Sequence, residues 1–181
     1  MKLHLSEAQL LQEWQLRHLP PMVNAGCTVN LASGYDMDAI LSARMHDWYA
    51  SLLAAGDMSM LAPVEIGDRL SMATDSDGTG TIILPENVVR VVSVDMEGWK
   101  SPATITRDPL SRIAARQRSP YSRAGTDSPV AVIDGRTMRL YTPPSASARI
   151  SVTAIVDDPG EYYLDSAALS TIKSFYQEIT P

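Results

Sequence analysis

The sequence predicts an α+β fold with N-terminal helices, an antiparallel β-rich middle that contains a hairpin, and a C-terminal helix. Helical patterns come first, many short β-branched segments separated by turn residues follow, and an apolar stripe with helical spacing closes the chain. This order is typical of α+β proteins with an antiparallel sheet. We expect a single domain over residues 1–181, with a helical part at about 1–60 and 160–181 and a β-rich part at about 61–159.

The first part of the chain predicts two helices. Residues 6–18 have an apolar side, Ser6 is placed to cap them, and Pro20-Pro21 ends the helix. Residues 35–55 form the clearest helix, because apolar residues recur at three- and four-residue spacing up to Gly56. This face indicates either a core or a subunit interface. Its residues are Met37, Ile40, Leu41, Met45, Trp48, Tyr49, Leu52 and Leu53.

The middle of the chain predicts strands joined by turns. A hairpin is expected around Asp134-Gly135-Arg136, since Asp-Gly favours a tight primed turn. A short helix is expected within residues 109–118. The predicted strands are 64–73, 81–84, 88–96, 103–107, 130–133, 137–141 and 149–156.

The C-terminal segment, residues 164–179, predicts a helix. Its apolar residues repeat with helical spacing, and Asp165 or Ser166 lies near its start. The stripe consists of Leu164, Ala168, Ile172, Phe175 and Ile179.

The composition narrows the classes of function. The net charge is −6, whereas proteins that hold nucleic acid through its phosphates usually carry a basic excess. The single cysteine, Cys27, excludes an intrachain disulfide. The N-terminus has no signal-peptide pattern, and no apolar run is long enough to predict a transmembrane helix. No motif for a nucleophile, a phosphate loop or a paired-histidine metal site is present, so we expect no enzymatic activity.

Residues 75–86 match the residue types of a twelve-residue calcium loop. In such a loop, side-chain oxygens, a carbonyl and a bidentate glutamate converge on one hard cation. However, strand-like sequence flanks the segment where helices are expected, and Asp, Ser and Gly are also typical of a tight turn. A turn and a calcium site are therefore both open, and no cofactor other than calcium is expected. The ligands would be Asp75, Asp77, Thr79, Thr81 and Glu86.

Residues 107–125 concentrate positive charge in an acidic chain. Five arginines occur there with a single acid, Asp108. The segment is either a surface for an acidic protein partner or a neighbouring subunit, a local contact with DNA, or a solvated helix and loop. The arginines are Arg107, Arg112, Arg116, Arg118 and Arg123.

The stretch from Leu84-Pro85-Glu86 through a valine-rich run to Gly98-Trp99 resembles head-tail connector proteins of short-tailed phages, the adaptor or tail tubular family. Three later features are similar too: residues 117–121, the hairpin between 128 and 143, and the strand 149–156 with its Asp-Pro turn and following helix. The resemblance covers residues 84–179, about half of the chain.

The resemblance implies a non-enzymatic virion protein made in the bacterial cytoplasm. Members of such a family assemble as a ring beneath the portal, contact portal and tail proteins, and let DNA pass through a channel without specific binding. No membrane is involved. The chain would belong to a phage or a prophage. We expect its contacts to use Trp99, Arg112, Arg116, Arg118, Tyr121 and Arg123.

Overall fold

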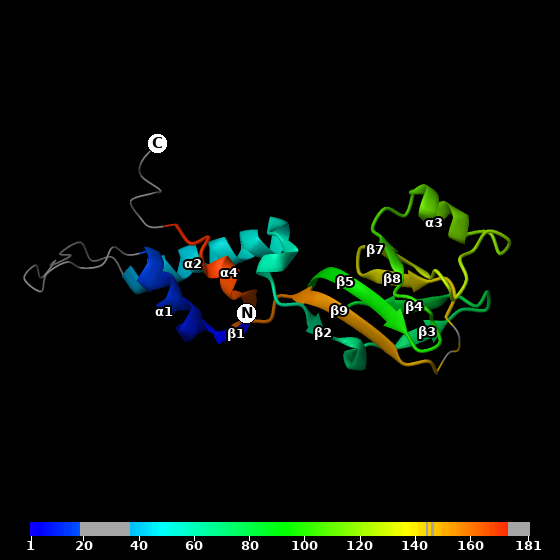
Figure 1. Ribbon diagram of the computed structural model, residues 1–181, viewed down its shortest axis with the longest axis horizontal. Coiled ribbons are helices and arrows are strands. Elements are labelled where there is room, and N and C mark those ends of the chain that lie inside the picture. Colours follow the sequence, from blue (N-terminus) through cyan, green and yellow to red (C-terminus); the bar gives the residue numbers. More distant parts are fainter. Residues whose placement is uncertain (19–36, 144, 146, 174–181) are drawn as a thin grey trace, which may run out of the picture. The chain divides into compact units, whose positions relative to one another are not determined.

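The chain divides into two compact units, Met1–Ala62 with Asp157–Pro181, and Pro63–Val156 (Figure 1). The computed structural model describes residues 1–18, 37–143, 145 and 147–173. Helices and sheets are both present, which confirms the α+β class.

The first unit contains helices and one two-stranded antiparallel sheet, in which β1 pairs with β10. Ser6 caps α1 as predicted, and it does so in a capping box. The Gln9 N–H donates to Ser6 Oγ at 3.4 Å, and the Ser6 N–H donates to Gln9 Oε1 at 2.9 Å. The elements are β1 (Lys2–Ser6), α1 (Glu7–His18), α2 (Met37–Ala55), the 3₁₀ helix η1 (Met58–Met60), β10 (Glu161–Asp165) and α4 (Ser166–Leu169).

The apolar face predicted for α2 forms part of the core of this unit. Trp48 is half-buried and Ile40 is exposed, so the face is narrower than predicted. The α2 residues buried in this core are Leu41, Met45, Tyr49, Leu52 and Leu53.

The prediction for the C-terminal segment was wrong at its start. Leu164 lies in strand β10, opposite Leu3 of β1, and α4 is only four residues long. Burial alternates along β10, with Tyr162 and Leu164 inside. Leu164 therefore belongs to the two-residue repeat of a strand, although it also fits the helical spacing of the residues that follow it. Phe175 and Ile179, the last residues of the predicted stripe, lie outside the described residues.

The second unit contains two sheets. One has the strand order β2-β9-β5, and the other has the order β3-β4-β8-β7-β6. The elements are β2 (Val64–Glu65), the 3₁₀ helix η2 (Gly67–Arg69), β3 (Met72–Thr74), β4 (Gly80–Ile83), β5 (Val88–Met96), β6 (Thr104–Thr106), α3 (Arg112–Gln117), β7 (Val130–Asp134), β8 (Thr137–Leu140) and β9 (Ile150–Val156).

Two details of this unit correct the sequence prediction. Strands β6 and β7 pair in parallel, although an antiparallel sheet was expected; the connection that contains α3 is long enough to return the chain in the same direction. The strand predicted at residues 64–73 is interrupted by η2, where Gly67 lies so close to the Ile150 carbonyl that no Cβ would fit. The Asp134-Gly135 hairpin is confirmed, and Gly135 has a φ of 57°.

Candidate interaction site

The arginine-rich segment forms the connection between β6 and β7, and α3 is its ordered centre. The Ala114 N–H donates to Ser111 Oγ at 3.2 Å, which caps the helix. Ala114 is buried against Val130, Val132 and Tyr141. One face of α3 is therefore packed on its own unit, and the opposite face points to solvent.

Gln117 and Arg123 tie the end of this segment to the unit. Gln117 is buried, and its Oε1 accepts a hydrogen bond from the Ala124 N–H at 2.8 Å. The Arg123 guanidinium donates to the carbonyl oxygens of Gln117 (3.2 Å) and Asp77 (3.0 Å). It also lies 3.3 Å from the Asp77 carboxylate and 5.7 Å from the centre of the Tyr141 ring. Arg123 thus contacts its own chain extensively, and only 14% of its side chain is exposed.

Two further arginines also bind backbone of their own chain. Arg107 Nη2 donates to the carbonyl oxygen of Val91 at 3.0 Å, and Arg118 Nη2 donates to that of Pro109 at 3.2 Å. These bonds help to shape the connection.

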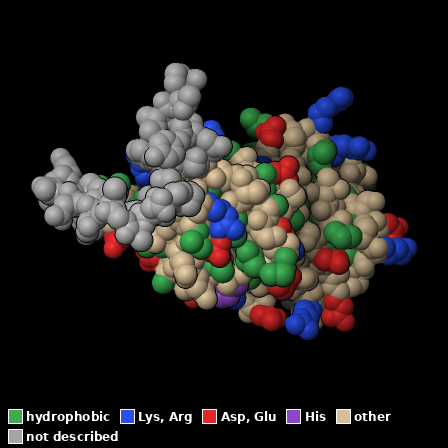
Figure 2. Space-filling model, turned by 60° about the vertical axis from the view of Figure 1, so that its left-hand side comes forward, with side chains coloured by type: hydrophobic (Ala, Val, Ile, Leu, Met, Phe, Trp, Pro, Cys, Tyr) green, Lys and Arg blue, Asp and Glu red, His purple; other side chains and the backbone are tan. Residues whose placement is uncertain are grey.

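Five exposed residues on and next to α3 form a surface that we call the α3 patch. Leu110 is 82% exposed, Tyr121 is fully exposed, and Ile113 is 44% exposed. The side chains of Arg112 and Arg116 are exposed and have no hydrogen bond or ion pair within the described residues. Figure 2 shows basic, hydrophobic and acidic side chains near one another on the upper right of that view. The patch comprises Leu110, Arg112, Ile113, Arg116 and Tyr121.

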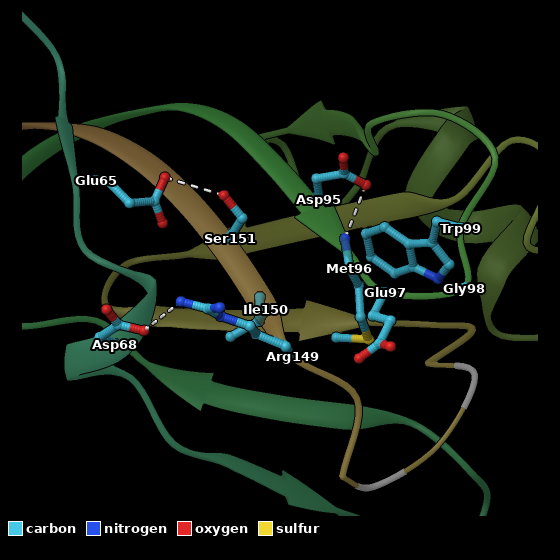
Figure 3. Close-up of a pocket in the computed structure, with 10 residues that line it drawn as sticks. All are labelled: Glu65, Asp68, Asp95, Met96, Glu97, Gly98, Trp99, Arg149, Ile150 and Ser151. Atoms are coloured by element: carbon cyan, nitrogen blue, oxygen red, sulfur yellow. Dashed lines mark hydrogen bonds and ion pairs between the residues drawn. The ribbon is translucent and has the colours of Figure 1, made fainter.

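Trp99, the other predicted contact residue, lies at a cleft on the same unit. Gly98 has a φ of 93°, which turns the chain after β5. The Trp99 indole is half-buried, and its Nε1 donates to the carbonyl oxygen of Thr142 at 2.8 Å. This bond fixes the ring along one side of the cleft, which has a volume of about 700 Å³ (Figure 3).

Negative charge dominates the lining, and we call this feature the acidic cleft. It is formed by β2, η2, the end of β5 and the start of β9, so its residues are distant in the sequence. One arginine, Arg149, lies 3.3 Å from Asp68. The carboxylates that line the cleft are Glu65, Asp68, Asp95 and Glu97.

Glu65 joins strands β2 and β9. Its Oε1 accepts hydrogen bonds from the N–H groups of Gly67 (3.0 Å) and Val152 (2.8 Å). Its Oε2 accepts from the hydroxyls of Ser151 (3.0 Å) and Thr153 (3.3 Å). Burial acts to raise the pKa of the Glu65 carboxyl, but the four hydrogen bonds together outweigh it and hold that pKa below its ordinary value. Glu65 therefore already has its partners inside the chain.

Asp95 and Glu97 are more accessible to a binding partner than Glu65 is. Both are exposed. Asp95 Oδ1 accepts a hydrogen bond from the adjacent Met96 N–H at 2.8 Å. Within the described part of the chain, the Glu97 carboxylate has no partner. These two groups can accept hydrogen bonds from a cation that enters the cleft.

The predicted calcium loop begins with a tight turn between β3 and β4. The Gly78 N–H donates to the Asp75 carbonyl oxygen at 3.0 Å, and Gly78 has a φ of 76°. The Asp77 carboxylate accepts hydrogen bonds from the hydroxyl (2.8 Å) and the N–H (3.0 Å) of Thr79. These bonds and Arg123 lower the pKa of Asp77.

The other predicted ligands already have partners within the chain. Thr81 Oγ1 donates to Asp75 Oδ2 at 3.1 Å. Glu86 forms an ion pair with Arg136 at 2.6 Å. Over the described residues, no group of three or more acids, histidines or cysteines is close enough to hold a metal ion.

Comparison with protein-family models, with curated proteins and with solved structures found no match to this chain.

Proposed function

We propose that the protein is a structural protein of a phage or prophage virion, of the head-tail connector or adaptor type. It acts by binding and ring assembly beneath a portal, without an enzymatic step. The α3 patch is the observation that supports this proposal. It presents Arg112 and Arg116, which have no partner among the described residues, and the exposed Ile113 on the anchored helix α3. The exposed Leu110 and Tyr121 lie on the chain that flanks this helix. Arginine and aromatic residues are enriched at protein interfaces.

The proposed partners are other copies of this chain, the portal and tail proteins. DNA would pass through the ring without specific binding, in keeping with the net charge of −6. The protein would be made in the bacterial cytoplasm and then reside in the virion. Among the described helices, none has both the length and the apolar character to cross a membrane.

Gel filtration with light scattering tests this function, first on the native protein and then with the portal protein encoded beside it. We expect a ring-sized species in the presence of the portal. The variant R112E/R116E should lose that species. The matched control K2E/R139E changes the same number of exposed cations elsewhere and should retain it. A chromosomal neighbourhood without portal, terminase or capsid genes would contradict the proposal.

Calcium binding at residues 75–86 is the second candidate function, but no feature of the geometry favours it, since Glu86 is paired with Arg136. Isothermal titration with calcium tests it directly. Heat that saturates at one ion per chain and disappears in D75N/D77N would establish this site.

A further inference from the structure

We propose that the α3 patch of one copy docks in the acidic cleft of the next copy, so that the chains associate head to tail. This inference rests on the proposed function, because it assumes that the chain self-assembles. It adds which two surfaces meet and which side chains pair.

The acidic cleft has the size and charge to receive the patch. Its volume of about 700 Å³ is large enough for several side chains. Among the described residues that line it, Arg149 is the one cation and is paired with Asp68, and Glu65 is occupied by hydrogen bonds of its own. Asp95 and Glu97 therefore leave uncompensated negative charge at the cleft, beside the Trp99 ring.

The α3 patch has the complementary chemistry. Arg112 and Arg116 are four residues apart on α3, so their guanidinium groups lie on one face of the helix. A guanidinium can bind a carboxylate with two parallel hydrogen bonds, which suits pairing with Asp95 and Glu97. Ile113, the neighbour of Arg112 in α3, is exposed beside the two arginines and provides an apolar surface to contact Trp99.

The two surfaces lie on different parts of the same unit. Figure 1 shows α3 standing above β7 and β8, away from β2 and η2, which contribute to the cleft. An interface between two different patches of identical chains is heterologous, and it produces a closed ring when the rotation between copies closes. A second copy also suits the cleft better than nucleic acid does, because phosphates would be repelled by its carboxylates.

Two charge-reversed variants test the pairing. R112E/R116E reverses the patch, and D95R/E97R reverses the cleft. Sedimentation velocity over a range of concentrations would measure self-association after nuclease treatment. We expect each variant alone to self-associate at least about tenfold more weakly than the parent, because like charges then face each other across the interface.

Mixing the two variants gives the decisive result. D95R/E97R keeps the original α3 patch, which can dock in the original cleft of R112E/R116E. The acidic patch of R112E/R116E and the basic cleft of D95R/E97R also attract each other. Association in the mixture should therefore return to within about threefold of the parent, a difference below 1 kcal/mol. Such recovery also shows that both variants are folded, and circular dichroism of each alone provides an independent check.

The inference would be overturned by a parent that stays monomeric up to its solubility limit, by a cleft variant that associates normally, or by a mixture in which association does not recover. Loss of DNA binding in R112E/R116E with unchanged self-association would identify the patch as a nucleic-acid surface instead, which also refutes it. The proposed function fails separately, if no ring forms with the portal.

Discussion

Glu65 offers the sharpest test of how the second unit is held together. Replacing it with alanine removes four hydrogen bonds, two of them from the backbone N–H groups of Gly67 and the buried Val152. Each backbone bond contributes about 1 kcal/mol, whereas the exposed hydroxyls can bond to water instead. We therefore expect E65A to lower the free energy of unfolding by about 2 kcal/mol.

The matched variant E65Q separates the hydrogen bonds from the charge. Its amide oxygen can still accept from the two N–H groups, so its loss should be about 1 kcal/mol or less. Because the folded-state pKa of Glu65 is lowered, the stabilisation is present above the ordinary value of 4.5 and is lost as the pH falls through the folded pKa. E65Q should remove this part of the acid sensitivity.

Urea unfolding followed by circular dichroism would measure both effects, at neutral pH and below pH 4.5. Hydrogen exchange of the β9 amides would show that the loss is located in this unit. Equal unfolding midpoints for the parent and E65A at neutral pH would refute the reasoning. So would an E65Q protein that keeps the full acid sensitivity of the parent.

Two further predictions concern the α3 segment and the first unit. R123A removes the bonds to Asp77 and Gln117, so limited proteolysis within residues 107–129 should speed up at least about threefold, while R112A should leave the rate unchanged. Burial raises the pKa of Tyr49 to about 12, above its ordinary 10.0. The contribution of the neutral Tyr49 to the free energy of unfolding is therefore fully present below pH 10 and falls as the pH rises towards 12, by up to about 3 kcal/mol. Denaturation of Y49F at alkaline pH should show a shallower fall; a slope equal to that of the parent would contradict this assignment.

The sequence predicts those parts of the fold that local patterns specify. The Asp134-Gly135 hairpin and the Ser6 cap were predicted because each depends on neighbouring residues. Strand β1 was missed because its five residues acquire strand geometry by pairing with β10 at the other end of the chain. The alternation of Leu3 and Leu5 with polar residues is a strand signal, but it is short and does not identify the partner strand. The helical spacing that begins at Leu164 hid the strand character of that partner.

The acidic cleft was beyond sequence reasoning for a similar reason. Its residues come from four separate elements and the turns beside them, and Trp99 is the one lining residue that the sequence predicted as a contact. The sequence showed the segment of five arginines. It could not show which of them form hydrogen bonds within the chain and which remain free to bind a partner. The difference lies in which carbonyl or carboxylate each guanidinium reaches, and this depends on tertiary packing.

The division among the arginines bears on how the α3 patch would bind. Gln117 and Arg123 fix the end of the segment before any partner arrives, and Ala114 fixes one face of α3. A surface that is ordered in advance loses less conformational entropy on docking, so more of the contact energy remains as affinity. Binding through Arg112 and Arg116 therefore depends on the intrachain contacts of Arg123. R123A should weaken association although Arg123 lies outside the α3 patch, and a segment loosened in this way should slow the formation of the complex more than R112A does.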